Sequence, residues 1–290
     1  MSRIARPKTQ TGILRKRVLR KIKDNLRLLM GGPVLLLFIA MALLSHQFSP
    51  VDPLKINARN ILKSPSLDNP LGTDQLGRDI LSRIIYASRV SLSVAGAAVL
   101  IAVFVGVFLG LLLGYFEGWF QNIGMRLIDI LVCVPEIFIA IVVVAFLGSS
   151  LTTLVLTIGF LYFPQFTRVT QGMTLSMKKR EFILASVSSG AGKFRILFRG
   201  ILPNISSIVI VQTSFTLSFA MLLEAGLSFL GLGVMPPQPS WGQMIGELKN
   251  YIFINPLPVI FPSVTLFLAV FSMNMVGDWV QDRLNPEIIK

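Results

Sequence analysis

Val90–Tyr115 reads VSLSVAGAAVLIAVFVGVFLGLLLGY and contains no charged side chain. A helix needs roughly 20 mainly apolar residues to cross a hydrocarbon layer about 30 Å thick, so this stretch predicts a helix that spans a bilayer. Its glycines Gly106, Gly110 and Gly114 recur every four residues and share one helical face. Small residues at this spacing let two helix backbones approach closely. We therefore expect this face to pack against another helix, with the lining of a transport pathway as the alternative.

Five further stretches are long and apolar enough to cross a bilayer. The composition agrees, because 53% of the 290 residues are hydrophobic and only 14% are charged, too few charges for a water-exposed surface. We expect an all-α integral membrane protein with six transmembrane helices. The predicted spans are approximately Pro33–Phe48, Val90–Tyr115, Leu127–Leu147, Leu151–Thr170, Ile205–Ala225 and Val259–Val280, the first extended backwards to Leu26.

The spans divide the chain into five parts. We expect a basic N-terminal tail over 1–29, a first transmembrane helix over 30–48, an extracytoplasmic loop with an interfacial helix over 49–89, a transmembrane core over 90–280 that contains a cytoplasmic segment over 178–203, and a C-terminal tail over 281–290.

The placement of charge predicts the topology. The net charge is +13, but ten cations precede the first span and six more lie in the cytoplasmic segment, whereas 226–258 has only Lys249. The positive-inside rule therefore places both termini in the cytoplasm, and this placement argues against nucleic-acid binding. The 49–89 loop is the exception, since it carries six cations that four aspartates only partly offset.

The inventory of reactive side chains argues against an enzyme. Metalloproteases need paired histidines and serine hydrolases usually need one as a base, but His46 is the only histidine and is expected to be solvated. Cys133 lies in an apolar run, which predicts a packed, unreactive thiol. Gly190–Lys193 resembles the end of a phosphate-binding loop, yet Val187 and Phe194 stand where that pattern needs a glycine and a hydroxyl. We therefore expect no metal, no cofactor and no ATP to bind to this chain.

The segments outside the spans carry two further patterns. Leu76, Ile80 and Ile84 recur at helical spacing before the second span and predict a helix that lies flat at the outer interface. Trp241 and Tyr251 lie in the second long outer segment and fit an interfacial aromatic belt.

Ionisable residues inside the membrane are costly and usually face protein or water. Asp129 lies one turn after Arg126, which predicts a neutralising pair. Glu136 follows Pro135, where it either holds a kink or lines a pathway. The polar residues of the last two spans also suggest a wet channel. The candidate pathway residues are Glu136, Ser214, Ser218, Glu224, Asn274 and Asp278, with interfacial solvation as the alternative for Glu224 and Asp278.

The cytoplasmic segment is expected to fold as helix, glycine turn and helix. An apolar stretch from Phe182 leads to the Gly190–Gly192 turn, and a second stretch ends at Pro203. The second stretch has an apolar stripe of Phe194, Leu197, Phe198 and Ile201, with basic residues off the stripe. An exposed apolar and basic surface requires a partner, either a protein or anionic lipid.

This segment resembles the coupling motif of bacterial ABC importer permeases, in which an E-A-A triplet precedes a glycine and a leucine-proline pair. Ala185, Gly190, Leu202 and Pro203 match the motif. Ser186 replaces the second alanine, and Leu184 stands where the motif has glutamate, with Glu181 three positions earlier. The resemblance implies that Arg180, Glu181, Ala185, Ser186, Gly190, Ala191, Gly192, Phe194 and Arg195 couple the chain to an ATPase.

Other stretches are similar to the C-type permease of dipeptide, oligopeptide and nickel importers. They are Leu71–Asp74 with Gly77–Asp79, Phe229–Gly233, Pro236, Pro237, Pro239, Trp241–Gly242, and the ending Asn274, Gly277–Asp278, Asp282 and Pro286. The resemblance implies the type I importer arrangement in a bacterial inner membrane. It also implies a second permease subunit as heterodimer partner, two cytoplasmic ATPase subunits that bind ATP and Mg²⁺, and an extracytoplasmic substrate-binding protein.

The resemblance favours peptides as cargo, with nickel or metallophore complexes and glutathione as alternatives. Two other functions are conceivable from the residues. One is a proton- or sodium-coupled carrier that works alone with Glu136 or Asp129 as relay. The other is a membrane scaffold that recruits a cytoplasmic protein through Lys178–Ile201.

Overall fold

The computed structural model describes the backbone of residues 10–284 and the side chains of residues 26–284. Within that part of the chain the secondary structure is helical, apart from an isolated bridge between Thr73 and Asp79. The long helices are α1 (Gln10–Leu43), α3 (Ile80–Tyr115), α6 (Leu151–Lys178), α9 (Leu202–Phe229) and α11 (Leu257–Leu284). The shorter elements are α2 (Ser45–Phe48), α4 (Trp119–Cys133), α5 (Glu136–Leu147), α7 (Glu181–Ser188), α8 (Lys193–Arg195), a π-helix (Ile196–Ile201), α10 (Trp241–Leu248) and the 3₁₀ turns Ala58–Asn60 and Lys249–Tyr251.

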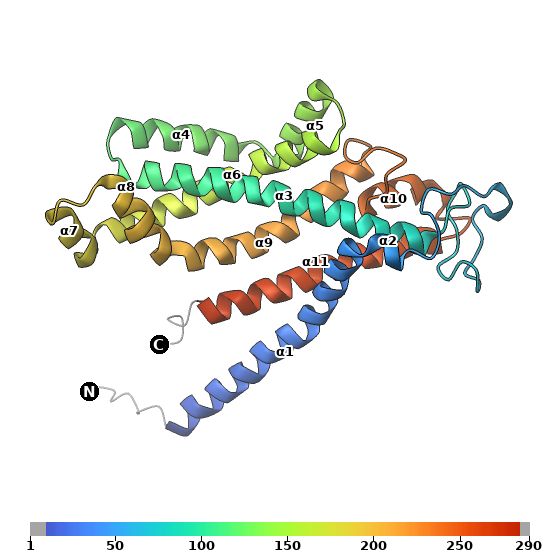
Figure 1. Ribbon diagram of the computed structural model, residues 1–290, viewed down its shortest axis with the longest axis horizontal. Coiled ribbons are helices and arrows are strands. Elements are labelled where there is room, and N and C mark those ends of the chain that lie inside the picture. The colour runs from blue at the N-terminus through green and yellow to red at the C-terminus, as the bar shows by residue number, and fades with distance from the viewer. Residues whose placement is uncertain (1–9, 285–290) are drawn as a thin grey trace, which may run out of the picture.

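Helices α3, α6, α9 and α11 run roughly along the long axis of the molecule, α1 crosses it obliquely, and the two ends of the molecule carry different elements (Figure 1). One end holds α7, α8, the start of α1 and the end of α11. The other end holds α2, α10 and the loop between α2 and α3. The expected cytoplasmic segment and the described ends of the first and last helices therefore lie on the same side of the molecule.

The packing of α3 against α6 is the most extensive contact between two helices, and the three spaced glycines make it possible. A Cβ atom on Gly106 would lie 2.5 Å from the Phe166 Cβ, and one on Gly110 would lie 2.6 Å from the Thr170 Cβ. At Gly114 it would lie 2.5 Å from the Thr174 Cβ. No residue with a side chain fits at such distances. The helix-packing interpretation of this face is confirmed.

Four helical segments of the described chain are long and apolar enough to cross a membrane, and α4 with α5 forms a fifth if the bent pair is one span. The four are Leu26–Leu43, Ile80–Tyr115, Lys193–Phe229 and Leu257–Leu284. Helix α6 has 28 residues, or about 42 Å at the usual rise, but it is interrupted by polar residues such as Gln165 and Arg168. The six-span topology with cytoplasmic termini therefore stays a prediction.

The interfacial helix expected within 49–89 is not a separate element. Ile80–Arg89 forms the first turns of α3, which continues through 36 residues without a proline. Asp79 starts the helix as its N-cap, because its Oδ2 accepts a hydrogen bond from the Ser82 backbone N–H at 2.8 Å. At about 54 Å the helix is longer than the hydrocarbon layer is thick, so it extends beyond the bilayer.

The third predicted span is broken. Helix α4 ends at Cys133, α5 begins at Glu136, and the two axes differ by 89°. Pro135 has no N–H to continue the hydrogen-bond ladder, which explains the break between the two helices. The predicted span Leu127–Leu147 is therefore two helices with a sharp bend at the proline, where the sequence predicted a broken hydrogen-bond ladder. Cys133, expected to be packed, is exposed at the end of α4.

Trp241 is a core residue and not part of an interfacial belt. Its side chain is fully buried, its Nε1–H donates to the Ile84 backbone carbonyl at 3.2 Å, and its ring meets Phe38 edge-on at 5.5 Å. Helix α10 packs against α9 and α11, so the tryptophan at its start is enclosed by the outer ends of the long helices. The sequence predicted an aromatic residue near the interface, but not the short helix that buries it.

We expect Gly110→Ala to destabilise the protein by about 1–3 kcal/mol, because the added methyl group must displace α6. Gly96→Ala is the matched control on the same helix, since a Cβ there meets nothing within 4 Å. Alanine at that position should be neutral or slightly stabilising. Thermal unfolding of the purified protein in detergent measures both changes. Equal melting temperatures for the two variants would contradict the proposed contact.

Candidate functional site

The segment between α6 and α9 folds into the predicted helix, turn and helix. Arg180 is the N-cap of α7, and the chain reverses through Gly190, which has φ of +77°. Two backbone hydrogen bonds close the turn, from the Gly190 N–H to the Val187 carbonyl at 2.9 Å and from the Ala191 N–H to the Ser186 carbonyl at 3.1 Å. Glycine adopts this left-handed conformation without steric cost, so the turn depends on Gly190.

Buried apolar side chains fix this segment to the ends of two long helices. Ile183 of α7 and Leu197 and Ile201 of the π-helix are buried in one cluster with Val107 and Leu111 of α3. A fully buried side chain of this size contributes roughly 1.5–3 kcal/mol. The segment is therefore a rigid extension of α3 and α9 and not a loose loop.

The predicted apolar stripe divides between two surfaces. Leu197 and Ile201 are buried in the cluster, but Phe194 is 66% exposed and stacks on Phe198, with ring centroids 6.4 Å apart. The exposed large apolar side chains of this segment are Phe182, Leu184, Val187, Phe194 and Phe198. Of the expected coupling residues, Arg180, Glu181, Ala185, Gly190, Gly192, Phe194 and Arg195 are exposed, and Ser186 and Ala191 are half-buried. Among the side chains of residues 26–284, none covers this coupling surface.

Two lysines attach the base of the segment to the end of α3. Lys178 Nζ donates to the Tyr115 carbonyl at 2.8 Å and forms an ion pair with Glu117 at 3.1 Å. Lys193 Nζ lies 5.3 Å from the ring centroid of Phe116, a cation–π distance. The lysine that resembled a phosphate-binding residue therefore contacts an aromatic ring.

Pro203 does not end the second helix as predicted. The chain passes from α8 through the π-helix into α9, and the Leu202 N–H bonds to the Leu197 carbonyl five residues earlier. Pro203 is the second residue of α9, where a missing N–H is tolerated. The wider π turn thus lets the chain continue as one helical segment across the proline.

A chain of polar side chains links α5, α6 and α9 within the apolar part of the molecule. Gln165 Nε2 donates to Glu136 Oε1 at 3.3 Å, and Gln212 Nε2 lies 3.5 Å from Gln165 Oε1 and 3.3 Å from Thr216 Oγ1. The Tyr162 hydroxyl also hydrogen-bonds Glu136. Glu136 is half-buried at the break between α4 and α5. This polar ladder is the arrangement expected where helices face a water-filled path.

The other predicted pathway residues lie in two different places. Ser214 projects from α9 toward Gly277 of α11, beside which Asn274 and Asp278 are half-buried. Ser218 and Glu224 are buried inside the bundle, with 1% and 0% of their surface exposed.

Glu224 is held by serines and not by solvent. Ser228 Oγ donates to Glu224 Oε1 at 2.8 Å, and Ser91 and Ser240 lie beside the carboxyl group. In this conformation the structure does not bring Glu224 or Ser218 together with Glu136.

The ion pair predicted for Asp129 has a different partner. Arg168 of α6 donates through Nη2 to Asp129 Oδ1 at 2.7 Å, across 39 positions of sequence. We predicted Arg126, one turn earlier on the same helix. Packing of α4 against α6 brings the more distant arginine into contact.

A buried ion cluster at the outer end joins the first outer loop to α10. Arg78 Nε lies 2.6 Å from Asp74 Oδ2, and Glu247 Oε2 is 3.1 Å from both Arg78 Nη2 and Arg83 Nη2. Arg83 Nη1 also lies 3.5 Å from Asp74. Two of the cations that opposed the positive-inside rule are therefore neutralised inside the protein. Glu247, Gln165 and Gln212 were not among the predicted site residues, although polar residues within apolar helices were the available signal.

Comparisons with known proteins agree with this geometry. Residues 106–290 match the family described as binding-protein-dependent transport system inner membrane component. Glutathione transport system permease protein GsiD of Pectobacterium atrosepticum is 40% identical over 89% of this chain and 86% of its own length. Dipeptide transport system permease protein DppC of Alkalihalophilus pseudofirmus is 35% identical over 93% and 88%. Nickel transport system permease protein NikC of Escherichia coli K12 is 34% identical over 88% and 92%.

A solved structure shares the fold. A chain of the inward-facing MetNI methionine ABC transporter superposes with a TM-score of 0.59 and 16% identity, over 71% of this chain and 97% of that one. At this identity the likeness concerns the fold alone.

We expect Asp74→Asn to destabilise the outer end by about 3–5 kcal/mol, because two buried arginines would then share one carboxylate. Asp68→Asn, at an exposed position of the same loop, is the control and should change stability by less than about 1 kcal/mol. Thermal unfolding in detergent and protease sensitivity of the outer loop measure the effect. A melting temperature for Asp74→Asn equal to that of the control would show that the cluster contributes no stability.

Proposed function

This chain belongs to the family of binding-protein-dependent transport system inner membrane components, and on that premise we propose that it forms half of the translocation pathway of an ATP-driven importer of di- or oligopeptides. It is an inner-membrane permease. We infer that its partners are a second permease subunit in a heterodimer, two cytoplasmic ATPase subunits and an extracytoplasmic substrate-binding protein. ATP and Mg²⁺ bind to the ATPase subunits, and the chain itself carries no catalytic site.

The observation that carries the proposal is the coupling surface. Its exposed apolar side chains surround a rigid glycine turn at the end of the molecule where α1 starts and α11 ends. Contiguous exposed apolar groups rimmed by charge mark protein–protein contacts. We infer that an ATPase subunit covers this surface, and that Leu184, in place of the motif glutamate, contributes apolar contact where other permeases have a charge.

The anchoring of the segment between α6 and α9 supports a role as a lever that moves the long helices. Since Ile183, Leu197 and Ile201 pack on α3, a displacement of the coupling surface moves α3 and α9 with it. Helix α9 carries Gln212 of the polar ladder, so movement at the surface reaches the candidate pathway. ATP shifts such an equilibrium only by binding one arrangement better than the other.

The exposed apolar surface of the helix pair α4–α5 supports the inference that a second permease subunit is a partner. Most side chains of this pair are exposed, including Leu127, Ile130, Phe138 and Phe146. We infer that the second permease covers part of this face and that Glu136, Gln165 and Gln212 line the pathway between the two subunits. The family membership argues against a carrier that works alone and against a scaffold.

Peptides are the proposed cargo because the DppC relative is named for dipeptide transport. The glutathione and nickel relatives keep glutathione import and metal or metallophore import as the alternatives. The complex, reconstituted in liposomes with its own binding protein, should take up a labelled dipeptide or oligopeptide when ATP is supplied. Uptake of Ni²⁺ or glutathione without peptide uptake would move the assignment to that alternative.

We expect Gly190→Arg to uncouple ATP hydrolysis from transport while the protein still inserts normally. A Cβ on Gly190 would meet no described atom within 4 Å, so the substitution disturbs only the backbone at its positive φ and the docked partner. Gly148→Arg is the matched control, because Gly148 also has φ of +79°, also has open space around it, and lies at the other end of α6. In the Gly190 variant, ATPase activity should no longer respond to loaded binding protein, or the ATPase subunits should no longer co-purify.

Insertion is checked by labelling of single cysteines in a Cys133→Ser background. An impermeant thiol reagent should reach cysteines at Ser66 and Gln238 from outside and one at Ser189 only after lysis. Labelling of Ser189 from outside would overturn the topology. Wild-type transport and ATPase stimulation in Gly190→Arg would show that this segment is not the lever.

A further inference from the structure

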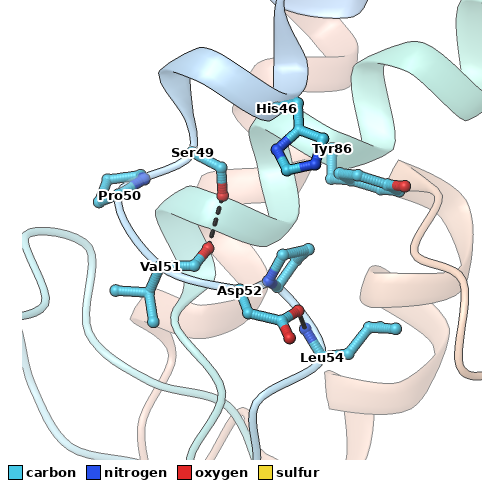
Figure 2. A pocket seen from close by; sticks show the side chains of 8 residues that line it. His46, Ser49, Pro50, Val51, Asp52, Leu54 and Tyr86 are labelled. Carbon is cyan, nitrogen blue, oxygen red and sulfur yellow. Dashed lines mark hydrogen bonds between the residues drawn. The ribbon is translucent and has the colours of Figure 1, made fainter.

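Two pockets follow one another along the outer ends of α1, α2 and α3. The outer pocket, of about 480 Å³, is lined by His46, Asp52 and Tyr86 among others. Figure 2 shows His46 and Tyr86 together on one side and Asp52 on the other. The second pocket, of about 520 Å³, is lined by Ile39, Ala42, Leu43, Arg89, Leu92 and Ser93. It lies about one helical turn farther along α3, since Arg89 comes three residues after Tyr86 in that helix.

The two pockets lie at the expected level of the outer lipid headgroups. The apolar window of α1 ends at Leu43, where the chain turns into α2. On α3 the uncharged stretch begins at Val90, directly after Arg89. Two helices therefore place the outer boundary of the hydrocarbon at the same height. The deeper pocket then reaches the acyl chains, and the outer pocket lies among the headgroups.

The charges in the two pockets have a defined order. Arg89 is exposed in the deeper, mainly apolar pocket, and among the side chains of residues 26–284 no carboxylate forms an ion pair with it. This distinguishes it from Arg78 and Arg83, which the ion cluster neutralises. Asp52 supplies a carboxylate in the outer pocket, where its Oδ1 accepts the Leu54 N–H at 2.9 Å. A cation therefore lies toward the bilayer centre and an anion toward the water.

We propose that these pockets bind one phospholipid of the outer leaflet that carries a phosphate and a primary ammonium group, such as phosphatidylethanolamine. Its phosphate accepts hydrogen bonds from the Arg89 guanidinium, which matches phosphate oxygens in geometry and charge. Its ammonium group, which lies farther from the acyl chains than the phosphate, donates to Asp52. Its acyl chains pack on Ile39 and Leu92. The charges of the protein are thus complementary to those of the headgroup, with Arg89 facing the phosphate and Asp52 facing the ammonium group.

This occupant explains features that a generic lipid contact does not. A headgroup without an amine, as in phosphatidylglycerol, leaves Asp52 facing a like-charged lipid surface. A trimethylated amine, as in phosphatidylcholine, has no N–H to donate. The site also accounts for a cation on the outer side of the membrane, where the charge asymmetry disfavours one. The inference does not depend on the cargo of the transporter.

The test measures lipid retained by the assembled transporter. The complex, purified in mild detergent, is incubated with equimolar phosphatidylethanolamine, phosphatidylglycerol and phosphatidylcholine, and bound lipid is counted by native mass spectrometry. Wild type should retain phosphatidylethanolamine preferentially. Arg89→Gln should reduce its retention by about tenfold, as expected for loss of a charge-assisted hydrogen bond. Asp52→Asn should remove the preference over phosphatidylcholine while some phospholipid still binds.

The controls are Arg59→Gln and Asp68→Asn, at exposed positions of the same loop, and both should retain lipid like wild type. Because Arg89 and Asp52 are themselves exposed, the two test variants should fold. No preference among the three lipids in wild type would overturn the proposal. Unchanged retention in Arg89→Gln, or a cross-link from the second permease into these pockets, would do so as well.

Discussion

Close approach of the α3 and α6 backbones is the constraint on which the rest of the structure depends. Three glycines one turn apart remove the side chains that would separate the two helices, and α6 lies along α3 in consequence. This contact positions Gln165 for the polar ladder and Arg168 for its pair with Asp129. It also places the C-terminal end of α6, and with it the coupling segment, against the end of α3.

The polar groups follow from a second constraint, the cost of an uncompensated charge in an apolar environment. The ion cluster satisfies it with two arginines and two carboxylates in direct contact, whereas Glu224 is met by neutral serines, and within residues 26–284 only its Oε1 accepts a hydrogen bond, from Ser228. Among the described residues, Glu136 has an amide partner, Gln165, and a phenol partner, Tyr162. Neither partner is a cation, so the Glu136 carboxylate has no neutralising charge among the described side chains.

The two ends of the molecule are held together by different interactions, ion pairs at one end and apolar packing at the other. The outer end is fixed by buried ion pairs and by Trp241, which tie α10 to the first outer loop and α3. At the other end the buried side of the coupling segment is apolar, and its exposed side is also apolar, around Phe194 and Phe198. Because the coupling surface is anchored rigidly on α3 and exposed on its other side, it suits a contact through which a partner subunit moves the helices.

Composition, run length and glycine spacing determined the membrane class, the α3 packing face and the turn at Gly190, because each rests on residues close together in the chain. The motifs also indicated the family. Only the tertiary structure decided that Arg168, and not Arg126, pairs with Asp129, that Trp241 is buried, and that Gln165 meets Gln212. It also revealed the 89° break at Pro135 and the division of the Phe194 stripe. Each of these depends on which helices pack together, and a local pattern carries no information about a neighbour distant in sequence.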